Sequence, residues 1–189
     1  MINIFFISLL VSFSCVSESL ASGCPDVKGV ENFNLTGVSE GIWYELGRYE
    51  YDIEVATSCV VVRTWPQGAG FVGESINVPS SSPEHLRAQC NIVGDSGRGV
   101  LNFTLSSGGE VKKMRQLPEV VVIYQEGDNI ISYSCLEDEA NNKKEEFAWI
   151  FSRKPQIVGV ERKDLASTIM SLDVLDINKF IWIDQSHCN

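Results

Sequence analysis

The stretch "GVSEGIWYELGRYEYDIE", residues 37–54, places Gly41 and Trp43 at the head of an alternating apolar segment. Alternation of this kind predicts a strand, because successive side chains of a strand point to opposite faces. Tryptophan is a large apolar side chain to find at the start of a strand, and we expect it to cover another part of the molecule. The rest of the chain indicates what that is.

From Gly41 onward the chain repeats one pattern, a short apolar run followed by a turn-rich piece such as "PQGAG", "GDSGRG" or "EGDN". Eight strands at this spacing predict an all-β sandwich or an antiparallel up-and-down barrel in one domain, rather than βαβ units. The expected strands are 41–52, 58–65, 70–78, 85–93, 99–106, 119–125, 129–136 and 146–152.

One helix is expected near the C-terminus, in "VGVERKDLASTIMSL", residues 158–172. A last strand is expected in "NKFIWID". A single helix after a meander of strands must pack on the outside of the barrel to bury its apolar stripe. The stripe consists of Val160, Leu165, Ile169 and Leu172.

Strand alternation predicts which side chains face the interior. In 85–93, Cys90 shares the apolar face and His85 points the other way. In 58–65, Cys59 should point out of the wall. A glycosylated Asn102 must also point outward. The interior is therefore expected to be aliphatic and aromatic, with Val60, Val62, Leu101, Phe103 and Leu105 among its lining. A barrel of this size is either filled by side chains or holds one small ligand.

Residues 1–23 have the layout of a secretory signal, with an apolar run from Ile4 to Phe13 and small residues before the predicted cleavage site. The run is too short to span a membrane. Residues 24–189 are then a single secreted domain. Sequons at Asn34 and Asn102 predict glycosylation in the same compartment.

The formal net charge is −10, and −9 without the signal, whose single charge is Glu18. This acidity argues against nucleic acid and anionic membranes as partners. Five cysteines follow the signal, which in an oxidising compartment indicates two disulfides and one thiol. The chain has two histidines and no Cys-x-x-Cys pair, so no zinc site or other metal site is expected.

Two short motifs match catalytic or cofactor patterns without their context. "GAGFVG", residues 68–73, fits Gly-x-Gly-x-x-Gly, but a strand-like segment follows it where a dinucleotide site needs a helix. "GDSG", residues 94–97, lacks the histidine and aspartate that a serine nucleophile requires. We interpret both as turns. The charge run 137–146 is interpreted as a solvated hairpin tip.

Gly41-x-Trp43 and "FAWIFSRKP", residues 147–155, resemble the first and third sequence blocks of the lipocalin family. "ENFNLTGVSEGIWYELGRY", "YSC" and "DQSHC" are most similar to the apolipoprotein D branch, with the bilin- and retinol-binding branches nearby. The family's middle block, a Thr-Asp-Tyr turn, is absent, and Tyr124-Gln125-Glu126 stands in its place. The resemblance covers nearly all of residues 24–189 and implies the eight-stranded antiparallel up-and-down barrel with one C-terminal helix outside.

The resemblance also implies roles for single residues. Trp43 would plug the closed end of the barrel, with Arg153 across its ring and Gly41 beside it. The cysteines would pair as Cys24–Cys135 and Cys59–Cys188, leaving Cys90 as a free thiol. Each disulfide would close a loop of more than 100 residues, worth about 4–5 kcal/mol in the chain-entropy model.

By resemblance, the chain is expected to be a secreted carrier, without a cofactor, for a small hydrophobic ligand such as a fatty acid, sterol, retinoid or bilin. Trp149, Phe147 and Phe151 are expected on the inner face of the last barrel strand. Two alternatives belong to other classes. One is a filled barrel that binds a cell-surface receptor through its outer surface. The other is an enzyme of the prostaglandin-isomerase kind that uses Cys90, although no basic neighbour is evident to activate the thiol.

Overall fold

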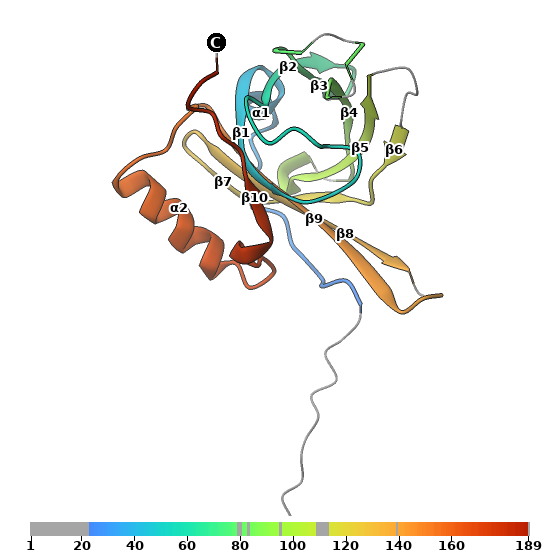
Figure 1. Ribbon diagram of the computed structural model, residues 1–189. Coiled ribbons are helices and arrows are strands. Elements are labelled where there is room, and N and C mark those ends of the chain that lie inside the picture. Colours follow the sequence, from blue (N-terminus) through green and yellow to red (C-terminus); the bar gives the residue numbers. More distant parts are fainter. Residues whose placement is uncertain are drawn as a thin grey trace, which may run out of the picture.

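The strands of the computed structural model form one antiparallel sheet that closes on itself (Figure 1). The structure describes residues 23–78, 81–82, 84–94, 96–108, 114–138 and 140–188. The expected signal segment, except for its last residue, therefore lies outside the described residues. Among them, no helix is long and apolar enough to cross a membrane.

Ten strands are present in the described ranges. They are β1 Gly41–Tyr49, β2 Val61–Gln67, β3 Gly70–Ser75, β4 Leu86–Ile92, β5 Val100–Ser107, β6 Met114–Gln116, β7 Val120–Glu126, β8 Asn129–Asp138, β9 Lys143–Ser152 and β10 Phe180–Trp182. The helices are α1 Leu35–Ser39 and α2 Val160–Ser171, with 3-10 turns at Ser96–Arg98 and Ile177–Lys179.

The eight strands β1–β5 and β7–β9 make the barrel, and β1 closes it by pairing with both β2 and β9. This confirms the predicted antiparallel up-and-down barrel. The last strand expected in "NKFIWID" is present as β10, which pairs with β1. The sequence did not predict α1 or the short strand β6, which pairs with β5. The turn expected in 68–73 lies at residues 68–69, between β2 and β3. The charge run 137–146 covers the paired ends of β8 and β9, as expected for a hairpin tip.

The expected strand 58–65 begins later than predicted, at Val61. Cys59 has a φ of 56°, a left-handed conformation that lies outside the extended region of a regular strand, so the chain is still in a loop there. The expected strand 41–52 likewise ends at Tyr49. Residues 50–60 therefore form a long connection between β1 and β2.

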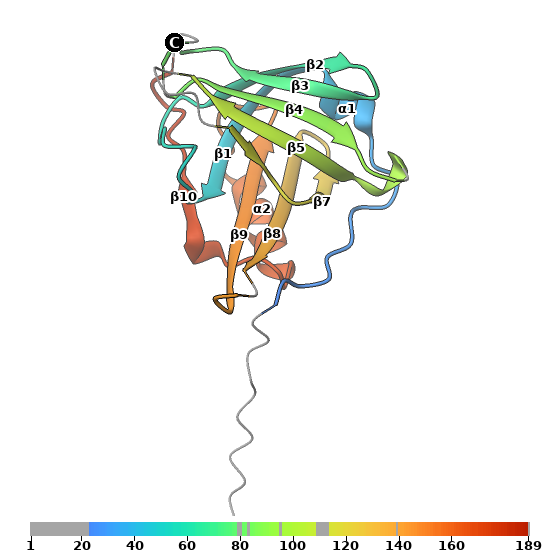
Figure 2. The same ribbon diagram turned by 90° about the vertical axis from the view of Figure 1, so that its right-hand side faces the viewer.

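The apolar side chains form two separate clusters, one on each side of the barrel wall. The inner cluster lies inside the barrel and includes Trp43, Phe71, Leu101 and Trp149. The outer cluster lies between α2 and the outside of β1, β8, β9 and β10, and includes Leu165 and Ile169. In Figures 1 and 2, α2 accordingly lies outside the barrel, as predicted.

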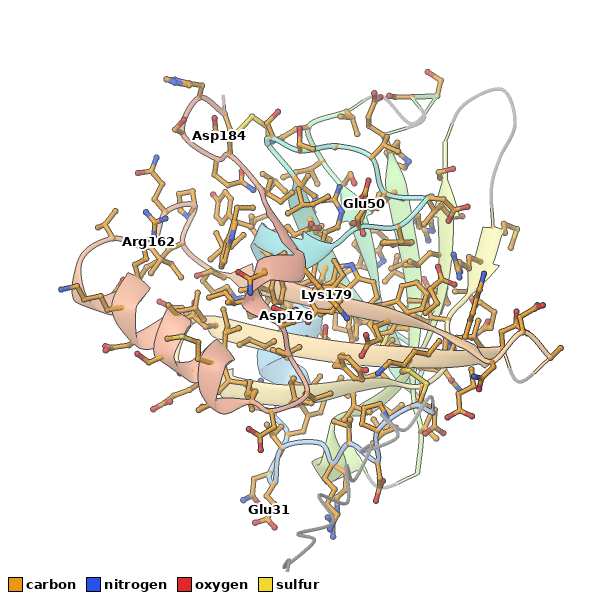
Figure 3. All side chains as sticks on the ribbon, turned by 60° about the horizontal axis from the view of Figure 1, so that its bottom comes forward. Glu31, Glu50, Arg162, Asp176, Lys179 and Asp184 are labelled. Carbon is orange, nitrogen blue, oxygen red and sulfur yellow. A yellow bond between two sulfur atoms is a disulfide. The ribbon has the colours of Figure 1, made fainter. Side chains whose placement is uncertain are left out.

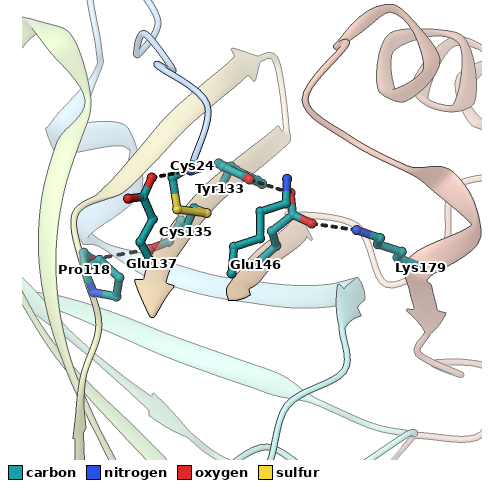
Figure 4. The surroundings of a disulfide bond; sticks show 9 residues. Cys24, Pro118, Tyr133, Cys135, Glu137, Glu146 and Lys179 are labelled. Atoms are coloured by element: carbon teal, nitrogen blue, oxygen red, sulfur yellow. Dashed lines mark hydrogen bonds and ion pairs between the residues drawn. A yellow bond between two sulfur atoms is a disulfide. The ribbon is translucent and has the colours of Figure 1, made fainter. Parts of the chain in front are cut away.

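Two disulfides are present among the described cysteines, in the pairing that the resemblance implied. Cys24–Cys135 ties the N-terminal segment to β8 (Figure 4), and Cys59–Cys188 ties the β1–β2 connection to the C-terminal segment. Cys90 is a free, fully buried thiol on β4. Burial raises its pKa, which lowers the fraction of reactive thiolate.

Alkylation should therefore modify Cys90 only in the unfolded protein. We expect intact-mass analysis under non-reducing conditions to show no added iodoacetamide in the native protein and one after denaturation. Peptide mapping should recover the links Cys24–Cys135 and Cys59–Cys188 and no other. A peptide that joins Cys90 to another cysteine of the chain would contradict both the pairing and the burial of β4.

Candidate ligand-binding site

One end of the barrel is closed by the stacked pair Trp43 and Arg153. The Arg153 guanidinium carbon lies 3.7 Å from the centre of the indole ring. Its nitrogens donate to three backbone carbonyls, those of Ile42 at 2.8 Å, Gly37 at 2.6 Å and Glu40 at 2.7 Å. The indole Nε1 donates to the Val38 carbonyl at 3.1 Å. The pair thus joins α1, β1 and β9 at this end, which Figure 2 shows next to α1.

Gly41 leaves the space that Arg153 occupies. Its φ is 109°, and a Cβ at this position would lie 2.8 Å from Arg153 Nη1. A larger residue would therefore strain the backbone and displace the guanidinium. This accounts for a glycine two residues before the tryptophan.

This chain lacks the Thr-Asp-Tyr block, and residues at the β7–β8 turn contact the closed end of the barrel in other ways. The side-chain amide of Gln125, at the end of β7, pairs with the backbone of Asn34. It accepts from the Asn34 nitrogen at 2.9 Å and donates to the Asn34 carbonyl at 3.2 Å. The Asp128 backbone carbonyl accepts a hydrogen bond from the backbone nitrogen of Arg153 at 2.9 Å. The β7–β8 turn is therefore still tied to the closing residues.

Both sequon asparagines are exposed, Asn34 before α1 and Asn102 on β5. Glycosylation at these positions remains a prediction. The side chain of Asn34 caps α1 by accepting from the Gly37 nitrogen at 2.9 Å.

Above the plug lies a cavity of about 130 Å³. One water needs roughly 10–15 Å³ in the same measure, so the space is about ten times larger than a single water site. Six residues predicted from the sequence line it, and they are Val62, Leu101, Phe103, Leu105, Trp149 and Phe151. Trp43 also lines it, so the plugging residue forms the cavity floor as well.

Two predicted lining residues do not face this cavity. Val60 is buried outside the strand, and its carbonyl accepts from the Glu45 nitrogen at 3.1 Å and from Gln185 Nε2 at 2.8 Å. Because β2 starts only at Val61, Val60 belongs to the preceding connection and packs within the barrel wall instead of pointing into the cavity. Phe147 is fully buried behind Trp149, with which it stacks at a ring separation of 6.1 Å.

The interior is not only aliphatic and aromatic as expected from strand alternation, because a buried group of charges also lies within the barrel. Glu45, Arg48 and Glu54 are between 0% and 9% exposed. By contrast, the charged residues labelled in Figure 3 are all exposed on the outside. Arg48 Nη1 donates to Glu45 Oε1 at 2.7 Å, and Arg48 Nε lies 3.9 Å from Glu54 Oε2.

Arg48 also holds the connection after β1. Its Nη2 donates to the carbonyls of Glu54 at 2.8 Å and Ala56 at 2.6 Å. Strand β1 starts at the closed end, so the connection that follows it begins at the opposite end. Arg48 therefore fixes residues 54–56 across that end, which brings Tyr51 and Glu54 into the cavity lining.

The charges of this group change one another's pKa values. Burial and the neighbouring Glu54 carboxylate raise the pKa of Glu45 well above its usual value. Burial alone would lower the pKa of Arg48, but the carboxylates of Glu45 and Glu54 raise it, so the guanidinium stays charged. Burial and Glu54 also raise the pKa of the Tyr51 hydroxyl.

The sequence contained one signal for this group. Alternation from Trp43 places Glu45 on the same face of β1, which puts a carboxylate inside the barrel. A β-bulge between Glu45 and Gly47 then shifts the alternation by one residue, so that Arg48 also points inward while Tyr49 joins the outer cluster. The bulge has no clear signal in the sequence.

The other candidate reactive groups lie away from the cavity. His85, expected to point outward, is buried rather than solvated, with Nε2 3.2 Å from Glu74 Oε1. Cys90 packs in the inner cluster but does not line the cavity. Among the described residues, no group of histidine, cysteine, aspartate and glutamate side chains is arranged to hold a metal ion.

No protein-family model matches the chain, and no curated protein matches it in sequence. Several solved structures, however, match it in fold. Insecticyanin from the tobacco hornworm Manduca sexta superposes with a TM-score of 0.70 at 22% identity, over 87% of each chain. H1 crustacyanin from the lobster Homarus americanus gives 0.59 at 17% identity, over 87% of this chain and 94% of that one. A biogenic amine-binding protein gives 0.58 at 16% identity, over 88% of this chain and 90% of that one.

These similarities concern the fold. They do not distinguish the apolipoprotein D branch, so that finer resemblance remains a prediction from the sequence. The closed eight-stranded barrel and the helix outside it agree with these neighbours, and the Trp43–Arg153 closure agrees with the sequence blocks. The chain has the lipocalin fold.

Proposed function

We propose that this protein is a secreted carrier that binds one small, largely apolar molecule inside the barrel. The observation that supports this most is the cavity itself, which is walled by aliphatic and aromatic side chains and closed at one end by Trp43 and Arg153. Burying apolar ligand surface there contributes roughly 25 cal/mol per Å². A few polar groups at the other end would orient the ligand.

Two structural neighbours support a carrier role. One is named a biogenic amine-binding protein, and another, LTBP1, has a structure in complex with leukotriene C4, with a TM-score of 0.52 at 14% identity over 79% of this chain. Secretion is supported by the two disulfides and by the exposure of both sequon asparagines.

Ligand binding should quench tryptophan fluorescence, because Trp149 is 6% exposed and lines the cavity. We expect saturable quenching at micromolar concentration or better by N-phenyl-1-naphthylamine, a neutral apolar fluorophore, and by retinol. Trp149→Phe should remove most of the quenching and weaken binding by about 1 kcal/mol, since phenylalanine keeps much of the apolar contact. Trp43 also lines the cavity and accounts for the residual signal.

The matched controls are Trp65→Phe and Trp182→Phe. Trp65 packs under Arg87 and does not line the cavity, and Trp182 is 50% exposed on β10. Both variants should keep the full quench. If no apolar compound quenches saturably, the barrel is filled and the protein acts through its outer surface. If Trp149→Phe keeps the full quench, the carrier role stands and Trp149 does not contact the ligand.

A further inference from the structure

The cavity has one polar end, formed by Tyr51 and Glu54 from the β1–β2 connection. Both residues line the cavity, and they pair with each other across a single β-bridge. Glu54 Oε2 accepts from Trp149 Nε1 at 3.0 Å. Tyr51 is only 7% exposed, and its hydroxyl lies near the Glu54 carboxylate, so that burial and this carboxylate raise its pKa. The buried hydroxyl makes no hydrogen bond of normal geometry to any described residue. A buried hydroxyl without a partner costs free energy unless a ligand or water satisfies it.

Neither of the two guanidinium groups in this region is among the residues that line the cavity. The two terminal nitrogens of Arg48 are committed to Glu45 and to the carbonyls of residues 54 and 56, and Arg48 is 1% exposed and absent from the lining. Arg115, on the short strand β6, is not among the residues that line the cavity: its guanidinium lies over the Phe147 ring at 4.9 Å and pairs with Asp52 and Glu145. The charged group among the described lining residues is thus the Glu54 carboxylate, whose Oε2 also lies 3.9 Å from Arg48 Nε behind it.

Aromatic rings stand beside that carboxylate. The ring centres of Tyr51 and Trp149 are 5.9 Å apart and almost perpendicular, and both rings line the cavity. A cation placed against these rings next to the carboxylate would contact an electron-rich ring surface as well as Glu54, and such contacts are worth more when water is excluded. A ligand carboxylate in the same place would face a like charge.

On the basis of the proposed carrier function, we propose that the ligand combines an apolar body with a protonated amine, which binds at Glu54 and Tyr51 while the body lies on Trp149 and Trp43. The ammonium group donates to the Glu54 carboxylate and to the Tyr51 oxygen. The proposal excludes fatty acids bound with their carboxylate at this end.

The test is a competition series in which only the head group changes. Octylamine, 1-octanol and octanoate displace N-phenyl-1-naphthylamine from the full secreted chain at pH 7. We expect octylamine to bind at least about tenfold more tightly than octanoate and more tightly than 1-octanol, as a charge-assisted hydrogen bond would give. Glu54→Gln should abolish the preference for the amine while the neutral probe still binds.

Tyr51→Phe should reduce the preference without abolishing it, and Glu50→Gln, in the same connection but exposed, should leave it unchanged. Equal or tighter binding of octanoate in the wild type would overturn the proposal, as would an amine preference that survives in Glu54→Gln. In both cases the probe still binds, so the carrier function stands. Absence of binding by the probe and by all three octyl compounds would instead overturn the carrier function, and this proposal with it.

Discussion

Trp43→Ala is expected to lower the free energy of unfolding by about 3–5 kcal/mol, the usual cost of truncating a buried aromatic residue to alanine. The indole is 5% exposed, forms the cavity floor and carries the Arg153 guanidinium on its outer face. Its removal joins the cavity to the closed end and leaves the guanidinium without its ring. Urea unfolding followed by circular dichroism measures the change.

Arg153→Lys and Trp182→Ala are the matched variants. Lysine keeps the charge but cannot donate to three carbonyls in a planar fork, so Arg153→Lys should lose about 1–3 kcal/mol. Trp182 is 50% exposed, and its replacement should cost well under 1 kcal/mol. If Trp43→Ala unfolds at the same urea concentration as Trp182→Ala, the ring does not close the barrel.

The barrel was predictable from the sequence because its signals are local. Alternation identifies the strands, and glycine-rich turns separate them, so element type follows from neighbours in the chain. The prediction placed Leu101, Phe103 and Leu105 correctly because β5 is regular along its length. It failed at Val60, where the left-handed conformation of Cys59 delays the start of β2.

The polar end of the cavity was not predictable in the same way. It depends on a bulge in β1 and on the path of a connection that Arg48 holds through two backbone carbonyls. Neither follows from local propensity, since both depend on contacts made after the barrel has closed. A charged residue on the inner face of a strand, as Glu45 is, was the one available sign.

Arg48→Met should destabilise the protein by about 3–5 kcal/mol at pH 7, as expected when one partner of a buried ion pair is removed. Methionine keeps an unbranched apolar stem but leaves the Glu45 and Glu54 carboxylates without a cation and two carbonyls without a donor. Adding Glu45→Gln should recover part of the loss, because one uncompensated charge disappears. Equal stability of Arg48→Met and the wild type in urea unfolding would show that the guanidinium is not buried in this pair.

The same group gives the wild-type stability a pH dependence with a defined sign. The folded state raises the pKa of Glu45, first through burial and then through Glu54, so the folded protein binds this proton more tightly than the unfolded chain. Its contribution to stability is therefore fully present below the unfolded value of 4.5 and is lost as the pH rises from there through the folded pKa. Glu45→Gln cannot titrate and should remove that fall. Melting temperatures of both proteins across this range measure it, and parallel curves would mean that Glu45 is charged in the folded state throughout.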